Sequence, residues 1–101
     1  MAKLISKTYG DALFELAVEE EKVDVLSEEI LEVKKVLDEN QEFGRLMNHP
    51  KIIKEEKIQL AQQVFADRIS KEIMGFLTII ISKDRYRNID EILDYFLAEV
   101  K

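Results

Sequence analysis

The chain has 101 residues and a formal net charge of −6, and it is 47% hydrophobic and 36% charged, with three glycines, one proline and no cysteine. This composition predicts long helices in about one domain, and it excludes a disulfide framework or a thiolate metal site. The negative charge opposes binding to a phosphate backbone, so no nucleic-acid partner is expected. The first residues lack the apolar core of a signal peptide, and no apolar run approaches the length of a membrane span. No direct membrane insertion is therefore expected.

The first helix is predicted over about residues 3–20, where a broad apolar arc lies opposite one narrow polar stripe. The apolar arc covers roughly 200°, about twice the width that a helix with one buried side requires. The first helix therefore has more apolar surface than a single core contact uses. The polar stripe recurs at every fourth residue and consists of Lys3, Lys7, Asp11, Glu15 and Glu19.

The second helix has a single apolar stripe and needs only one buried face. We expect Asp24 to cap it and the helix to end near residues 38–40, because these residues suit the two ends of a helix. The stripe has the period of a helix. It consists of Val23, Leu26, Ile30, Val33 and Leu37.

The middle of the chain is expected to be a short helical turn followed by a fourth helix. Within residues 41–50, Phe43 and Met47 suit a turn that plugs the bundle, and Pro50 marks a loop or the first turn of the next helix. The fourth helix is predicted over about residues 54–66, with Ile58 and Phe65 on its apolar edge.

The sequence "GFLTIIISKDR", residues 75–85, is locally compatible with a strand or a helix. A lone buried strand leaves its backbone N–H and C=O groups unpaired, and no other segment of the chain offers it a partner. We therefore predict a fifth helix over about residues 70–83, with Ser70 as its cap. Its apolar arc spans about 220°, so this helix also has more apolar surface than one core contact uses.

The last helix is predicted to begin after Asn88, which can cap it, and to bury one clean apolar stripe. Together the elements predict an all-α fold, a compact six-helix bundle with a short third helix, in a single domain over residues 1–101. The stripe of the last helix consists of Ile89, Ile92, Leu93, Phe96, Leu97 and Val100.

No residue pattern indicates catalysis, a cofactor or a metal. His49 is the only histidine, and Leu46 stands where a metal-binding helix would place a glutamate. A faint likeness to a calcium loop in residues 38–49 fails, because Phe43 occupies the position of the required glycine. The serines have no adjacent base, and no glycine-rich loop can hold a phosphate. The sequence does not favour an enzyme.

The apolar excess of the first and fifth helices has two interpretations. Helices central to a small bundle are often apolar nearly all round, or the excess lines a groove for a partner helix. The two helix edges combine small residues, which allow close approach, with aromatic anchors such as Phe76. The candidate groove residues are Ile5, Thr8, Tyr9, Ala12 and Leu16 of the first helix and Gly75, Phe76, Ile79 and Lys83 of the fifth.

Four segments in order resemble a known family. "TYGDALFELA", residues 8–17, resembles the first-helix signature of the delta subunit of bacterial F-type ATP synthase, whose mitochondrial counterpart is the oligomycin-sensitivity-conferring protein. Pro50 with Ile52 and Lys57 is similar to the segment that opens the family's fourth helix. Residues 75–85 and "IDEILDYF", residues 89–96, are similar to its fifth and sixth helices. Gly10 departs from the alanine expected there and should slightly weaken the first helix.

The resemblance implies a non-catalytic stator domain of six helices, without cofactors, on top of the catalytic head of the synthase. In this family the domain binds the amphipathic N-terminal helix of an alpha subunit in a groove between the first and fifth helices. A C-terminal domain, absent from this chain, contacts the peripheral-stalk b subunits. The resemblance also implies a peripheral position at the cytoplasmic face of the bacterial cell membrane. The alternative from another class is a generic helical adaptor that binds some other amphipathic helix.

Overall fold

The computed structural model describes residues 2–101, and Met1 of the predicted domain lies outside this range. All regular elements of the described residues are helical and the third helix is short, which confirms the predicted all-α six-helix bundle. Residues 75–82 belong to a helix and not to a strand. The elements are α1 (Ala2–Glu19), α2 (Val23–Glu39), α3 (Gln41–Met47), α4 (Lys54–Phe65), α5 (Lys71–Ser82), the 3₁₀ turn η1 (Tyr86–Asn88) and α6 (Ile89–Val100).

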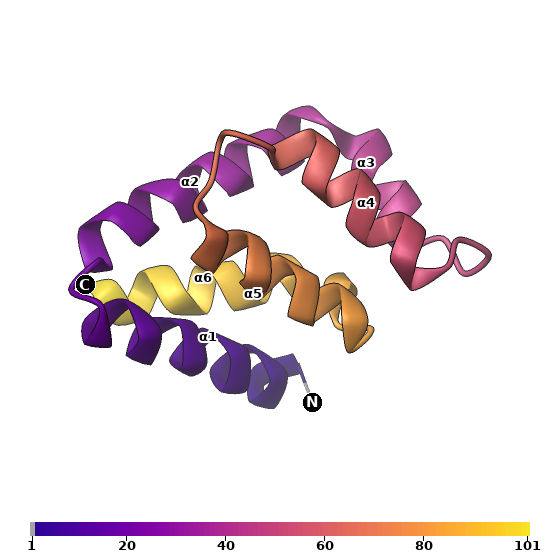
Figure 1. Ribbon diagram of the computed structural model, residues 1–101. Coiled ribbons are helices and arrows are strands. Elements are labelled where there is room, and N and C mark those ends of the chain that lie inside the picture. The colour runs from indigo at the N-terminus through magenta and orange to yellow at the C-terminus, as the bar shows by residue number, and fades with distance from the viewer. Residues whose placement is uncertain (1) are drawn as a thin grey trace.

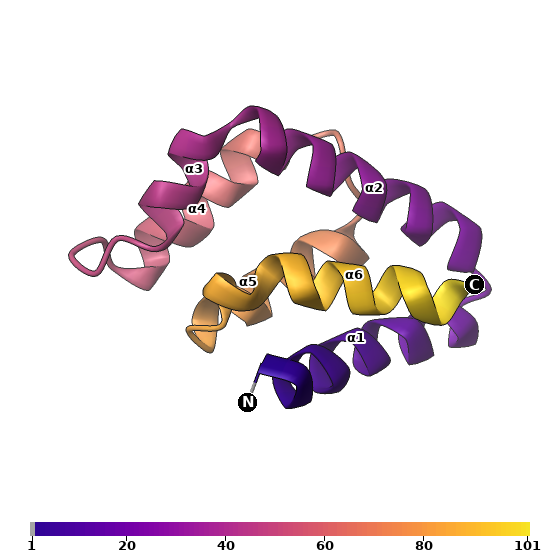
Figure 2. The same ribbon diagram turned by 180° about the vertical axis from the view of Figure 1, so that it is seen from behind.

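α6 lies between α1 and α2, as Figure 2 shows from behind. Its Ile92, Leu93 and Phe96 are fully buried, because α1 and α2 cover it on two sides. α5 packs against α4 and α2, and α3 and α4 form the far end of the bundle (Figure 1). The single clean stripe predicted for the last helix is therefore the centre of the core.

The close contact between α1 and α6 depends on the absence of a side chain at position 10. A β-carbon built on Gly10 would lie 2.5 Å from Cδ1 and 3.2 Å from Cβ of Tyr95 on α6. Real β-carbons do not approach other atoms so closely, so a side chain here would force the Tyr95 ring or the two helices to shift. Gly10, which the sequence suggested would only weaken the helix, is a packing requirement of the α1–α6 contact.

α3 plugs the far end of the bundle with aromatic contacts, as its sequence predicted. The ring of Phe43 meets Phe65 of α4 edge-on, with centroids 5.9 Å apart, and meets Tyr86 of η1 at 6.2 Å. Edge-to-face rings attract each other beyond the effect of their burial. Burial also raises the pKa of the Tyr86 hydroxyl well above its usual range.

Two predicted helix caps differ from the structure. Asp24 lies inside the first turn of α2, and Lys22 occupies the N-cap position without a side-chain cap. α2 begins early because the amide of Leu26 already donates to the carbonyl of Lys22, at 2.8 Å. Asn88 is at the predicted N-cap position of α6, but its side chain makes no capping bond. The 3₁₀ turn η1 leads directly into this helix.

A tight turn places Lys22 at the corner between α1 and α2. Glu21 has a φ of 55°, a left-handed conformation that costs energy for a residue with a side chain. This conformation lets the amide of Lys22 donate to Ala17 O at 2.8 Å and that of Glu21 to Val18 O at 3.1 Å. The last carbonyls of α1 are thereby satisfied and the chain reverses within two residues.

Replacing a buried leucine by alanine should destabilise the bundle. Leu13, Leu77 and Leu93 are 1%, 4% and 0% exposed, so truncating each of them should lower the free energy of unfolding by about 2–5 kcal/mol. Urea denaturation measures this difference. The matched control is Leu31→Ala on α2, because Leu31 is 55% exposed and should change stability by no more than about 0.5 kcal/mol. Equal midpoints for core and control variants would contradict the packing described here.

Glycine-to-alanine substitutions at two positions should change the free energy of unfolding in opposite directions. Gly75 is exposed on α5 and an added β-carbon meets nothing within 4 Å, so Gly75→Ala should stabilise by about 0.5–1 kcal/mol. Gly10→Ala should destabilise by about 1 kcal/mol or more, because the clash with Tyr95 outweighs the gain in helix propensity. Thermal unfolding of both variants tests this, and a stabilised Gly10→Ala would show that α1 and α6 are not in close contact.

Candidate partner-binding surface

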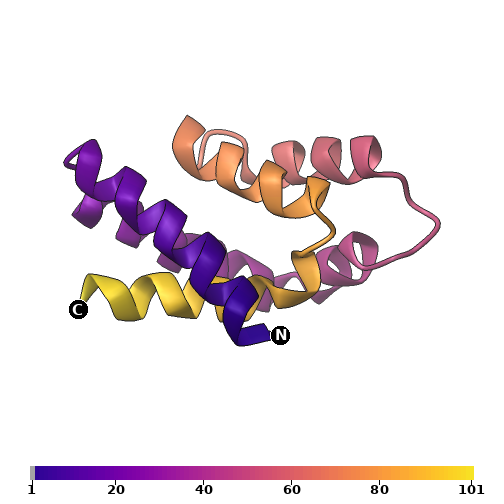
Figure 3. The same ribbon diagram turned by 90° about the horizontal axis from the view of Figure 1, so that it is seen from below.

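The candidate surface lies on α1 and α5, which run in opposite directions along one side of the molecule (Figures 1 and 3). The end of α1 at Glu19 faces the beginning of α5 at Lys71. We call this region the α1–α5 surface. It consists of the sequence-predicted residues Ile5, Thr8, Tyr9, Ala12 and Leu16 of α1 and Gly75, Phe76, Ile79 and Lys83 of α5.

The α1 part of the surface is an apolar edge that the core covers only partly. Ile5, Tyr9 and Leu16 are half-buried, whereas Thr8 and Ala12 are exposed. The Thr8 hydroxyl donates to the carbonyl of Leu4 at 2.8 Å, so its hydrogen-bonding capacity is already used within the helix. The edge therefore offers a partner mainly apolar groups, together with the Tyr9 hydroxyl and the Thr8 oxygen.

The α5 part of the surface is less uniform than the sequence suggested. Gly75, Ile79 and Lys83 are exposed, and the Ile79 side chain retains 51% of its accessible area. Phe76 is only 8% exposed, so its ring offers a partner less surface than the predicted role of an aromatic anchor implies. Its ring turns inward because Phe76 shares a helix side with Ile73 and Ile80, which are fully buried. Ile79 is the large apolar group that α5 exposes.

The orientation of α5 follows from a contact at its first turn. Glu72, Phe76, Ile79 and Lys83 follow one another at helical spacing and so share one side of α5. Glu72 reaches the corner between α1 and α2, where its Oε2 lies 2.7 Å from Nζ of Lys22. The first turn on the side of α5 that carries Ile79 therefore faces the corner between α1 and α2.

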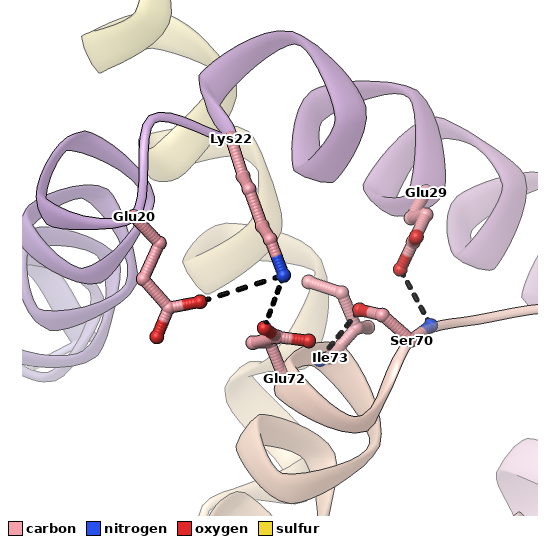
Figure 4. Close-up of polar contacts among 6 residues, drawn as sticks. All are labelled: Glu20, Lys22, Glu29, Ser70, Glu72 and Ile73. Carbon is pink, nitrogen blue, oxygen red and sulfur yellow. Dashed lines mark hydrogen bonds and ion pairs between the residues drawn. The ribbon is translucent and has the colours of Figure 1, made fainter.

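Lys22 joins two carboxylates at this corner (Figure 4). Its Nζ lies 2.7 Å from Glu72 of α5 and 3.6 Å from Glu20, the residue that follows α1. The hydrogen bond from Lys22 lowers the pKa of Glu72 from 4.5 to about 2. The bond to Glu72 likewise raises the pKa of Lys22. Both partners are thus held in their charged forms at neutral pH.

A second carboxylate contact fixes the beginning of α5. The Ser70 side chain accepts from the Ile73 amide at 3.4 Å, which confirms Ser70 as the cap. In a capping box a glutamate three residues after the cap would bind the cap's own amide, but this position holds Ile73. Glu29 of α2 replaces it, since its Oε1 accepts from the Ser70 amide at 2.8 Å (Figure 4).

These corner contacts were not predicted from the sequence. The charges of residues 18–22 resemble ordinary solvated helix-end charges, and nothing local shows that Lys22 meets Glu72, fifty positions away. The one available signal was the serine cap at Ser70 without a glutamate at its third following position, which indicates that another element supplies the missing acceptor.

Two pockets of the described residues lie away from the α1–α5 surface. One pocket of about 630 Å³ is formed by the α3–α4 loop and η1, and another of about 560 Å³ lies between α1 and α6 beside Tyr95. Within residues 2–101 no group of three or more histidine, cysteine, aspartate or glutamate side chains could hold a metal ion. None of the described helices is both long enough and apolar enough to cross a membrane.

The fold and surface define a class, an all-α bundle with partly exposed apolar edges on two antiparallel helices. Comparison with known proteins identifies the family within this class: residues 5–101 match the family of ATP synthase delta (OSCP) subunits. The chain belongs to this family, as its sequence motifs predicted.

Similar proteins include three bacterial ATP synthase delta subunits. That of Lachnoclostridium phytofermentans is 54% identical over 100% of this chain and 56% of its own length. Those of Clostridium beijerinckii and Alkaliphilus oremlandii are 38% and 37% identical, over 93% and 99% of this chain. The matches cover 52% and 56% of these two proteins. The chain thus spans about half the length of the relatives it matches.

The Lys22–Glu72 pair should make stability depend on acid pH. The Glu72 pKa is lowered from 4.5 to about 2, so its contribution is fully present above pH 4.5 and is lost as the pH falls through about 2. Between pH 5 and pH 2 the free energy of unfolding should therefore fall further in the wild type than in Glu72→Gln. Urea denaturation of both proteins at both pH values measures these losses. Because the other carboxylates are the same in both proteins, their effect cancels in the comparison. Equal losses in both proteins would contradict the ion pair.

Proposed function

We propose that the chain is a non-catalytic part of the stator of F-type ATP synthase and that its α1–α5 surface binds the amphipathic N-terminal helix of an alpha subunit. The observation that carries the proposal is the pair of partly exposed apolar edges on two antiparallel helices. An amphipathic helix binds such a surface by placing apolar residues at i, i+3, i+4 and i+7 against it. Membership in the delta subunit family supports ATP synthase as the partner complex.

The proposed role is mechanical. The domain holds the catalytic head against the torque of the rotating central stalk during proton-driven ATP synthesis. This role requires slow dissociation from the partner and no reactive group. The longer relatives support the proposal that this is the N-terminal domain of a subunit whose C-terminal domain contacts the b subunits. In this arrangement the protein is peripheral, at the cytoplasmic face of the bacterial membrane.

The distribution of charge supports a partner with a basic polar face. The chain has a net charge of −6, and Glu19 is exposed at the end of α1 beside the surface, whereas Glu20 and Glu72 are paired with Lys22. Opposite charges at the rim of an interface accelerate association and favour one orientation of the partner, while the apolar centre supplies most of the affinity.

Substitutions at the exposed positions of the surface should weaken binding of an alpha-subunit N-terminal peptide. Ile79→Asn removes the exposed apolar group of α5 and should lower affinity by about tenfold or more, as loss of a central apolar contact does. Ala12→Leu should weaken binding because the added bulk occupies space that the partner backbone needs. Calorimetric titration with the N-terminal peptide of the Lachnoclostridium phytofermentans alpha subunit measures both effects. Thermal melts followed by circular dichroism check that the variants are folded.

Matched controls place the same changes elsewhere. Leu31→Asn alters an aliphatic residue of α2 that is 55% exposed, and Ala98→Leu enlarges an exposed alanine of α6. Both should bind like the wild type. If Ile79→Asn and Ala12→Leu also do so, the α1–α5 surface is not the binding site. If the wild-type chain does not bind this peptide but binds unrelated amphipathic helices, the result would instead support a generic adaptor.

A further inference from the structure

We propose that Lys22, Glu72 and Glu29 form a clamp that sets the spacing between α1 and α5, and that this clamp prepares the α1–α5 surface for its partner. The inference rests on the proposed function, because it concerns the same surface. The three residues are positioning residues, since Lys22 bonds Glu72 and Glu29 accepts from the Ser70 amide at the end of the surface (Figure 4).

The first step is that α1 and α5 share one core but make few direct backbone contacts with each other. α5 packs mainly on α4 and α2, whereas α1 packs mainly on α6. The two helices that carry the surface thus belong to different halves of the bundle (Figure 3). The buried residues of α5 anchor it in the common core, and the corner contacts add polar bonds at the end where α5 begins beside the end of α1.

The second step is that the clamp holds this corner from two directions. Lys22, fixed by the left-handed turn at Glu21, bonds Glu72 in the first turn of α5 at 2.7 Å. Glu29 of α2 accepts from the Ser70 amide at 2.8 Å and so fixes the backbone at the start of the same helix. A helix held at its first turn by a side chain and by its backbone cannot easily tilt or slide.

The third step links the clamp to binding. Glu72 and Ile79 share one side of α5, so a rotation or tilt that releases Glu72 from Lys22 also moves Ile79 relative to α1. A partner helix that must contact both edges at once then has to restore their spacing, which reduces its affinity. The clamp residues should therefore affect binding without touching the partner.

The experiment measures the spacing directly. Because the chain has no cysteine, spin labels can be placed at exposed positions outside the surface and the clamp. Labels at Glu15 of α1 and Ser82 of α5 report the α1–α5 distance, and labels at Glu15 and Ala98 of α6 report a reference distance. Double electron–electron resonance is recorded in the wild-type background and in the variants Lys22→Met and Glu72→Gln. The Glu72→Gln change keeps the shape of the side chain and removes its charge.

The expected result is a broadened or shifted α1–α5 distance in both variants with an unchanged α1–α6 distance. Affinity for the alpha-subunit peptide should fall by about three- to fivefold, the size that loss of a partly exposed ion pair allows. Lys22→Arg, which keeps the charge and the donors, should restore both readouts. The matched control is Lys34→Met, because Lys34 forms a similar interhelical ion pair with Asp94 of α6, away from the surface.

Each outcome bears on a separate statement. Folded Lys22→Met and Glu72→Gln proteins with the wild-type α1–α5 distance would overturn the clamp. A changed distance with unchanged peptide affinity would overturn the link between the clamp and binding. If the wild type does not bind the peptide, the proposed function fails, while the distances still decide whether the clamp exists. Equal effects of Lys34→Met would show a general loss of stability and would also overturn the clamp.

Discussion

α1 can lie against α6 only because position 10 has no side chain, since a β-carbon there would come within 2.5 Å of Tyr95 Cδ1. This contact decides which parts of α1 are buried. Leu13 and Ala17, which share the contact side with Gly10, are buried almost completely, and the neighbouring edge with Ile5, Tyr9 and Leu16 remains half-buried. The surplus apolar surface of α1 is thus left beside the α1–α6 contact, on the edge assigned to the candidate surface.

The elements could be predicted from the sequence because their signals are local and periodic. The stripe of α6, the serine cap of α5 and the aromatic plug of α3 each depend on neighbouring residues, and the structure places all three as expected. The start of α2 was not predictable, because it depends on the left-handed turn at Glu21, a residue type that rarely adopts this conformation. The burial of Phe76 was missed for a different reason. A residue at the border of an apolar arc is buried or exposed according to how far the helix is rotated, and tertiary packing fixes that rotation.

The corner contacts show why the site was harder to predict than the fold. Lys22, Glu29 and Glu72 look like ordinary surface charges in the sequence, and each one acquires its role from a residue at least forty positions away. A single exposed ion pair usually contributes little to stability. At this corner two carboxylate contacts act on the first turn of one helix, and one of them satisfies a backbone amide, so their main effect is on geometry.

Exposed apolar side chains alone do not identify a binding surface, because Leu4, Val25, Leu31 and Ile53 are as exposed as Ile79. Ile79 differs from these residues in its neighbours on the same side of the helix. Leu31 lies among Asp24, Ser27 and Glu28 on its side of α2, whereas Ile79 lies between Phe76 and Lys83 on the side of α5 that carries Glu72. A partner helix on Leu31 would cover Asp24, Ser27 and Glu28, whereas a helix on Ile79 would cover Phe76 and one exposed charge, Lys83. In the proposed complex it would also contact the half-buried edge of Tyr9 and Leu16. The difference in desolvation, more than exposure itself, favours the α1–α5 surface for a partner helix.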